Sequence, residues 1–363
     1  MKKYITLAFV LSAALLSTAQ DATQLLPERY NDYALNYYLP KTVAEIEFVA
    51  TKTTCKAGPY YEYAQKYLGT TDVITQDIDI WNLERASIIS RGVANTDNRF
   101  QLTFKPGQLP YIFVDSEGTI LSINTHPNAF TPDSFPIVAP DIINNIDMNS
   151  ALSGEILMAG STAKMAEVAA KQIYYIRECR MDLLTGNADN VPADGEALKI
   201  IIDRLDQQEV ALTALFVGTR QVSHVTKIVK YAPQEDISNE VILRFSDQLG
   251  FVDANDLSGA PIYLNINITQ QGEYPVDNKG VEKRVPKGAI AYNIPGKAMI
   301  TIAYDNQTIA EKELQVAQLG VIFGIDPNLL TTKKSPTFVV FNPTTGGIAE
   351  IGVISEEETS TNE

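Results

Sequence analysis

Two long stretches with helical periodicity lie between strand patterns, and they constrain the fold of this chain more than any other feature. Residues 161–184 and 194–216 repeat apolar side chains at helical spacing, and the turn-forming sequence NADNVPA joins them. The positions expected to face each other or a sheet are Ile173, Ile176, Ile201, Ile202 and Leu205. We therefore expect a long αα-hairpin within an α+β fold.

Residues at the ends of these stretches fit helix starts and stops. Ser161 and Asp194 have side chains that accept a hydrogen bond from a first-turn amide, so they are expected to act as N-caps. Gly186 follows the first stretch, where a left-handed residue commonly ends a helix. The sequence thus predicts both the existence and the approximate bounds of the two helices.

Strand patterns with turn residues between them occupy the chain on both sides of the hairpin. Before it, alternating or β-branched runs lie at residues 43–54, 73–80, 86–90, 100–104, 110–114 and 119–124. After it, they lie at 222–231, 240–245, 262–270, 289–294, 298–304, 307–318 and 338–341. Their spacing predicts an antiparallel β-sandwich or open barrel on the C-terminal side, and residues 320–326 are expected to form a buried connection.

These patterns suggest a division of the chain into segments. We expect a signal peptide, a strand-rich N-terminal unit, a linker or wrapping loop, the αα-hairpin, a β-rich C-terminal domain and an acidic tail. Their residue ranges are, in that order, 1–20, 21–124, 125–150, 151–218, 219–350 and 351–363.

The first twenty residues, MKKYITLAFVLSAALLSTAQ, have the pattern of a cleavable signal peptide. A short basic region is followed by an apolar run too short to span a bilayer and by the small residues of a cleavage site. We expect an exported mature chain beginning at Gln20 or Asp21, with no integral membrane segment after cleavage. Because no cysteine follows the apolar run, we do not expect a lipoprotein; the nearest is Cys55.

The charge balance excludes some partners. The full chain carries 29 Lys+Arg against 44 Asp+Glu, a net charge of −15, and loss of Lys2 and Lys3 makes it −17. Such a field repels phosphate backbones and anionic headgroups, so nucleic-acid binding is not expected. The two cysteines, Cys55 and Cys179, are too few for a disulfide-dependent scaffold. Two free thiols are the favoured interpretation, with a single bridge as the alternative.

Serine and histidine chemistry receives little support. Ser161-Thr162-Ala163-Lys164 matches the S-x-x-K pattern of serine acyl-transfer enzymes, but the S-D-N and K-T-G companions are missing. Ser161 is better explained as a helix cap. His126 and His224 stand far apart, without a G-x-S-x-G elbow and without motif-spaced zinc ligands. We expect His126 to be a loop residue and His224 to lie on the surface of a sheet. We expect no catalytic residue and no cofactor.

Two acidic stretches could hold calcium. Residues 253–259 and 189–196 gather side-chain oxygens, but neither fits a D-x-[DN]-x-[DN]-G loop because Leu257 replaces a ligand and Asp194 is displaced. Ordinary turns explain both stretches better, so no metal is expected.

Tyrosines supply the candidate partner or ligand surface. One cluster, at the start of the mature chain, consists of Tyr30, Tyr33, Tyr37 and Tyr38. Tyrosine combines a large apolar ring with a polar tip and is enriched at interfaces. A second group, Tyr60, Tyr63 and Tyr67, follows helical spacing and is expected to pack in a core.

The order of three phrases resembles a known family. These phrases are YYLPKTV, KAGPYYEYAQKYLG and the pair AAKQIYYIRECRMDLLTG with DGEALKIIIDRLDQQEVALTALFVG. Together they resemble a family of exported Bacteroidetes proteins known only as a domain of unknown function. The resemblance covers nearly the whole mature chain and implies export and a single-family architecture, but it supplies no site residues.

These observations favour a non-enzymatic exported protein that works through protein–protein contacts in the periplasm or at the outer membrane, with a partner in the cell envelope. No nucleophile–base set or cofactor loop is recognisable, while long helices, edge strands and tyrosines suit binding. The alternative is a glycan-binding protein or a glycan hydrolase that uses carboxylates, which need no sequence motif. Two carboxyl groups about 5–10 Å apart in a cleft would favour that alternative.

Overall fold

The computed structural model describes residues 23–25, 34–103, 110–127, 130–138, 140–141, 146–189, 194–331 and 337–354. The strands are β1 (Thr23–Leu25), β2 (Ala34–Lys56), β3 (Ile78–Thr103), β4 (Ile112–Val114), β5 (Ile120–Ile123), β6 (Thr219–Tyr231), β7 (Ile237–Ser246), β8 (Gly250–Val252), β9 (Ala260–Gln270), β10 (Ile290–Tyr304), β11 (Gln307–Ile325), β12 (Thr337–Phe341) and β13 (Ile348–Val353). The helices are α1 (Ala64–Leu68), α2 (Gly154–Met158), α3 (Thr162–Thr185), α4 (Gly195–Val217) and α5 (Pro327–Leu330), with 3-10 turns at Tyr61–Tyr63 and Met148–Ala151.

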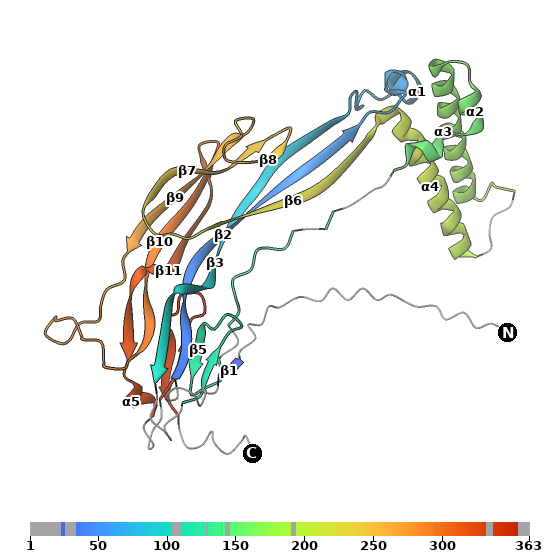
Figure 1. The fold of residues 1–363 in the computed structure, drawn as a ribbon. Helices are drawn as coiled ribbons and strands as arrows, with labels where there is room; N and C mark the ends of the chain where they lie inside the picture. Colours follow the sequence, from blue (N-terminus) through green and yellow to red (C-terminus); the bar gives the residue numbers. More distant parts are fainter. Residues whose placement is uncertain are drawn as a thin grey trace.

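The fold is α+β, as predicted, and its described strands form three antiparallel sheets. The first has the order β1-β4-β5-β12-β13, and the second has the order β11-β10-β9-β7-β8. The second sheet curls into a half-barrel on the C-terminal side. The third sheet, β3-β2-β6, is a long ribbon that runs from the β-rich body to the helices at the far end of the molecule (Figure 1).

The ribbon differs from the sequence prediction in the length of its strands. Residues 86–90 and 100–104 were expected to belong to separate strands, but they fall almost wholly within β3, which pairs with β2 from Ile78 to Thr103. Residues 73–77 precede this strand and are not part of it. Pro40 is accommodated because the β2–β3 register shifts between Tyr38 and Pro40. The strand therefore continues through positions where the local pattern alone indicated breaks, although residues 95–98 have no partner on β2 at the register shift.

The C-terminal strands also merge. Except for Ala289, residues 289–294 and 298–304 form one strand, β10, with a register shift between Ile294 and Gly296. Residues 320–326 were expected to form a buried connection, but they are mostly the end of β11, which pairs with β10 through Ile325. Likewise, residues 351–353 of the expected acidic tail belong to β13, while 355–363 lie outside the described residues.

Three apolar cores follow one another along the molecule. The first packs the ribbon on the second sheet and includes Ile46, Phe48, Leu264 and Ile300. The second packs the start of β2 and the end of β3 on the first sheet. The third lies in a helical head formed by the helices α1 to α4 and both 3-10 turns. The N-terminal and C-terminal strand patterns thus share the first two cores.

Polar side chains that are buried or half-buried tie β2 to the second sheet. The Tyr37 hydroxyl accepts a hydrogen bond from the amide of Ala291 at 2.7 Å and donates to its carbonyl at 3.1 Å. Thr42 lies on β2 just beyond the last residue that pairs with β6. Its N–H donates to the Gln318 side-chain oxygen at 2.9 Å, and its carbonyl accepts from the Gln318 side-chain nitrogen at 2.7 Å. This side chain occupies the place of a neighbouring strand and satisfies backbone groups that burial would otherwise leave unpaired.

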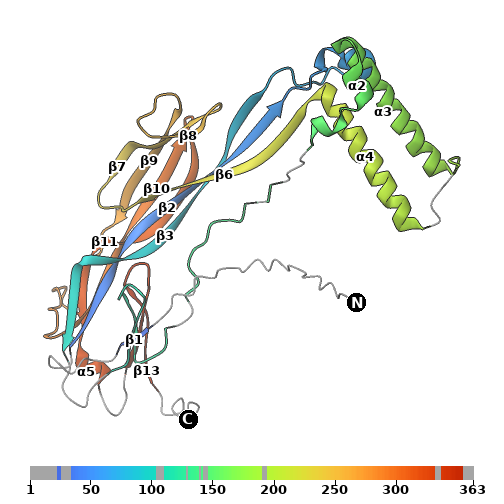
Figure 2. The same ribbon diagram turned by 45° about the vertical axis from the view of Figure 1, so that its right-hand side comes forward.

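The helical head joins the ribbon through a close backbone contact. The turn after β2 brings the N–H of Tyr60 to 2.8 Å from the carbonyl of Leu215 near the end of α4. A Cβ on Gly58 would lie 2.4 Å from that same carbonyl oxygen, so the position requires glycine. Figures 1 and 2 show α3 and α4 side by side, extending from this junction as an antiparallel hairpin.

An extended segment, which we call the strap (residues 130–138 and 140–141), crosses the face of the ribbon that points away from the first core. Arg85 Nη2 donates to the carbonyl of Pro136 at 2.9 Å, and the amide of His224 donates to Asp141 Oδ1 at 2.7 Å. On this outer face of β2, Val49 is 1% and Glu47 is 7% exposed. The strap therefore lies along the path from the β-rich body towards the head (Figure 2).

Candidate interaction site

The tyrosine cluster predicted as a partner surface does not form one in the described residues. Tyr30 and Tyr33 lie outside them. Tyr37 is 1% exposed, and its hydroxyl is bonded to Ala291. Burial raises the pKa of Tyr37, an effect that this backbone bond only partly offsets. Tyr38 is half-buried and donates its amide to Gly118. The prediction failed at Tyr37 because alternation along β2 turns this ring into the second core.

The second tyrosine group packs as predicted. Tyr60 is buried, with its ring centroid 5.7 Å from that of Phe216. Tyr63 and Tyr67 are half-buried against the same core, and their rings lie 6.4 Å apart. These tyrosines hold the base of the hairpin rather than forming a free surface.

Ser161 caps α3, as predicted. Its hydroxyl oxygen accepts from the amide of Lys164 at 3.3 Å. The Lys164 ammonium lies 3.0 Å from Glu167, and Lys171 lies 2.8 Å from the same carboxylate. Hydrogen bonds from Lys171 and Lys164 lower the pKa of Glu167 to about 2. Lys164 is thus engaged as a cation with Glu167, so its geometry does not serve a nucleophilic Ser161.

His224 lies on the sheet surface, as predicted, and has carboxylates on both sides. Its Nδ1 is 2.9 Å from Asp141 Oδ1, and its Nε2 is 3.9 Å from Glu84 Oε1. The bonds from His224, first from its backbone and then from its side chain, lower the pKa of Asp141. A hydrolytic triad needs a hydroxyl at the second ring nitrogen, and here that place is taken by Glu84. His126 lies in the loop after β5, with its ring 4.6 Å from Phe113.

The acidic stretches behave as turns where they are described. The amide of Asp256 donates to the carbonyl of Asp253 at 2.9 Å, and Asp256 Oδ1 accepts from the amide of Ser258. Asp194 caps α4 by accepting from the amide of Glu196 at 3.2 Å. Across the described ranges, no three His, Cys, Asp or Glu side chains gather closely enough to hold a metal ion.

Both cysteines are free in the structure. Cys55 is buried near the end of β2, and Cys179 is half-buried on α3. They belong to different parts of the molecule, the ribbon and the hairpin.

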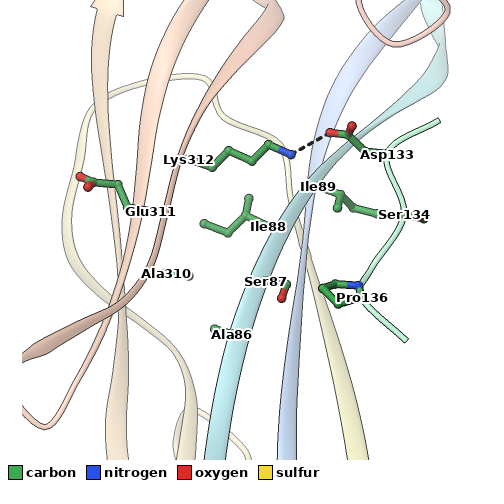
Figure 3. A pocket seen from close by; sticks show the side chains of 10 residues that line it. All are labelled: Ala86, Ser87, Ile88, Ile89, Asp133, Ser134, Pro136, Ala310, Glu311 and Lys312. Atoms are coloured by element: carbon green, nitrogen blue, oxygen red, sulfur yellow. Dashed lines mark hydrogen bonds and ion pairs between the residues drawn. The ribbon is translucent and has the colours of Figure 1, made fainter. Parts of the chain in front are cut away.

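A hollow of about 360 Å³ lies between β3, β11 and the strap (Figure 3). It holds two carboxylates, Asp133 and Glu311, but they do not face each other. Lys312 reaches across to Asp133 at 2.8 Å, while Glu311, its neighbour on β11, points the opposite way (Figure 3). A glycosidase needs both carboxyl groups to flank one bond, and this arrangement does not provide such a pair.

The outer-face carboxylates of β2 are likewise committed to cations. Glu45 lies 3.2 Å from Arg91 and 2.9 Å from Lys230. Burial raises the pKa of Glu45, but hydrogen bonds from Lys230 and Arg91 outweigh burial and leave this pKa below its ordinary value. Glu47 lies 3.5 Å from Arg85. These groups stabilise the ribbon rather than forming an open acid–base pair.

The surface that stands out is the far end of the hairpin. We call residues 162–176 and 211–217 the proximal half, and residues 177–185 and 195–210 the distal half. The proximal half buries small and large apolar side chains, including Ala166, Ile173 and Leu215. None of the distal side chains is buried. Its exposed apolar residues are Met181, Leu184, Ile200, Ile201 and Val210.

This outcome corrects the predicted helix face. Ile173 and Ile176 are buried, and Ile202 and Leu205 are half-buried, but Ile201 is 39% exposed. The helical period was identified correctly. The depth of burial was not, because no element among the described residues covers the distal half.

Ion pairs link the two helices where the halves meet. Arg177 Nε lies 2.5 Å from Glu209 Oε1, and Arg180 Nη1 lies 2.8 Å from Glu209 Oε2. Arg180 also pairs with Asp206. Arg177 lies over the ring of Tyr174, 5.6 Å from its centroid. Ion pairs therefore join the two helices at the start of the distal half, while its five exposed apolar side chains face solvent.

No helix among the described residues combines the length and apolar character needed to cross a membrane.

Residues 33–349 match the model of a family described as Domain of unknown function (DUF4831). No curated protein matches the chain, and no solved structure matches it.

Proposed function

Because the chain belongs to the DUF4831 family, a domain of unknown function, we propose its role from its own surfaces: it binds a protein partner through the distal half of the hairpin. The observation that carries this proposal is the set of exposed apolar side chains that the two helices present in the distal half, where no described side chain is buried. Large exposed apolar residues gathered in one place are typical of interaction surfaces.

The architecture suits such a role. The ribbon holds the hairpin at the end of the molecule opposite the first sheet (Figures 1 and 2). Ser161 and Asp194 cap the helices, and the Arg177–Glu209 pair joins them, so the surface is organised before binding. Preorganisation reduces the entropy lost on association.

We also propose that this binding occurs outside the cytoplasm, in the cell envelope. The support is the signal-like pattern of residues 1–20. Intact mass of the natively produced protein tests this step, with a mature start at Gln20 or Asp21 as the expected result. A chain that retains residues 1–20 would contradict export by this signal.

Site-specific photo-crosslinking tests the hairpin proposal. A photoreactive residue at Leu184 or at Ile200 is expected to capture one protein of defined mass in the native host. The matched control is Ile137, an exposed apolar residue on the strap, which is expected to give no such product. The double variant Met181→Asp/Leu184→Asp should abolish capture from position 200 because charges would enter the apolar contact. Equal capture from positions 137 and 184 would show that the hairpin is not the binding surface.

A further inference from the structure

Strand β6 has an open edge with an unusual charge. It is the outer strand of the ribbon and pairs with β2 along one side, from Thr219 to Tyr231. Its sequence, TRQVSHVTKIVKY, has three Lys or Arg and no Asp or Glu, in a chain of net charge −15. This strand is therefore locally basic in an acidic protein.

The direction of its backbone groups follows from one hydrogen bond. The amide of His224 donates to Asp141 of the strap and so points away from β2. Successive residues of a strand alternate, so the amides of Thr226, Ile228 and Lys230 point to the same open side. Within the described chain, Asp141 supplies the one hydrogen bond to the β6 backbone from outside its ladder with β2.

The open edge is accessible over residues 226–230. Thr226, Lys227 and Ile228 are exposed on both faces of the strand. The β2–β6 pairing continues here without a register shift, and no proline interrupts β6. Unpaired N–H and C=O groups on a regular edge are a template for another strand. Proteins often use such edges to bind an extended peptide.

Charge selects among occupants of this edge. Lys230 already contacts Glu45 at 2.9 Å, while Lys227 forms no ion pair with any described residue. The β6 strand of a second copy would bring cations opposite cations, which is destabilising. An acidic strand would bring carboxylates to the same positions. Asp141 shows that a carboxylate already binds an outward amide of this strand.

We propose that residues 226–230 of β6 bind an extended acidic segment of a partner protein by strand addition. The new strand would hydrogen-bond to the outward groups of Thr226, Ile228 and Lys230, and its carboxylates would pair with Lys227. This surface goes beyond the function proposed for the hairpin, because it is a separate site with a ligand of different chemistry.

Synthetic peptides test this proposal on the full chain. The probe is a fluorescent heptapeptide of alternating Glu and Val, and its binding is measured by anisotropy at low and high salt. A peptide with Lys in place of Glu is expected to bind at least about tenfold more weakly, because its positive charges repel Lys227. Two further acidic peptides carry N-methyl groups at alternate amides, one at the odd positions and one at the even positions. The peptide whose methyl groups block the amides that face β6 should lose binding. Equal binding by the acidic, basic and N-methylated peptides would overturn the proposal.

Variants of β6 locate the site. Ile228→Pro removes one outward amide and leaves the β2 ladder in place, and it is expected to weaken peptide binding about tenfold. Ile228→Val keeps the amide and should bind normally. Lys227→Glu reverses the charge of the edge without removing a backbone donor. It therefore remains informative if circular dichroism shows that the proline variant does not fold. Unchanged binding in Lys227→Glu would refute charge selection by β6.

Failure of this proposal can be told apart from failure of the hairpin proposal. Met181→Asp/Leu184→Asp should leave peptide binding unchanged, since these residues lie in the head. Loss of peptide binding in that double variant would instead place the peptide on the hairpin and overturn the β6 assignment.

Discussion

The proximal and distal halves of the hairpin belong to the same two helices, yet they differ in almost every physical respect. The proximal half packs Ala166, Ala169 and Ile173 against the base of α4 and the tyrosines of the head. The distal half keeps the same helical period, but none of its side chains is buried and five of its apolar residues are exposed. Its helices are joined by Arg177, Arg180 and Glu209 rather than by a buried seam.

This difference shows what helical periodicity measures. A repeat of apolar residues identifies the side of a helix suited to a contact, but it does not say whether the chain itself supplies that contact. In the proximal half the head supplies it. In the distal half the described chain supplies it only in part, so the exposed apolar residues become a candidate surface for a partner. Four predictions test this contrast, starting with the largest effect.

The largest contrast is expected between Phe216 and Leu184. Phe216 is fully buried at the base of the hairpin, so Phe216→Ala should lower the free energy of unfolding by about 3–5 kcal/mol through lost transfer energy and a cavity. The matched change Leu184→Ala removes an exposed side chain and should cost less than about 0.5 kcal/mol. Chemical denaturation of both variants measures the difference. Similar losses in the two variants would remove the distinction between the halves.

Removal of the two helix caps should also affect stability differently in the two halves, by a smaller amount. Ser161→Ala removes the cap of α3 in the proximal half and is expected to cost about 0.5–2 kcal/mol of global stability. Asp194→Ala removes the distal cap of α4 and should mainly increase fraying of its first turn. Hydrogen exchange of residues 195–199 records this local change. A larger global loss from Asp194→Ala than from Ser161→Ala would reverse the assignment.

Ile201 tests the corrected helix face. Because it is partly exposed in the distal half, Ile201→Ala should lower stability by less than about 0.5 kcal/mol. A loss of about 2–4 kcal/mol, as for a buried isoleucine, would show that the distal half is covered in solution. The same denaturation assay with Ile173→Ala gives the buried reference.

The smallest expected effect is the pH dependence of stability that arises from the Glu167 ion pairs on the surface of the proximal half. Lys171 and Lys164 lower the pKa of Glu167 from 4.5 to about 2 in the folded state. The resulting stabilisation is present above pH 4.5 and is lost as the pH falls through 2, because the unfolded state takes up the proton first. An NMR titration of the Glu167 carboxyl should give the lowered midpoint. Lys171→Gln should raise that midpoint, whereas an unchanged midpoint would show that the ion pair is not formed.

Much of the local structure could be predicted from the sequence. Ser161, Gly186 and Asp194 mark helix boundaries because capping depends on residues within one turn. The tyrosines at positions 60, 63 and 67 were expected in a core from their spacing, and they pack there. The α+β class follows from segments of period 3.6 between segments of period 2. These features depend on neighbours close in sequence.

The functional surfaces were harder to predict. Tyrosine is a typical interface residue, but the place of Tyr37 in β2 directs its ring into the second core, where its hydroxyl bonds to Ala291, 254 positions away. The basic run of β6 was visible in the sequence. Its open edge was not, because strand order decides which edge remains unpaired.

The sequence by itself thus determined the helices, their caps and the class of fold, since each depends on short-range sterics and hydrogen bonds. Only the tertiary structure decided that β3 continues unbroken, that Tyr37 is buried and that Ile201 is exposed. Those outcomes depend on which distant segment lies against each residue. Burial and strand pairing are properties of that contact, and a local pattern contains no information about whether the contact exists.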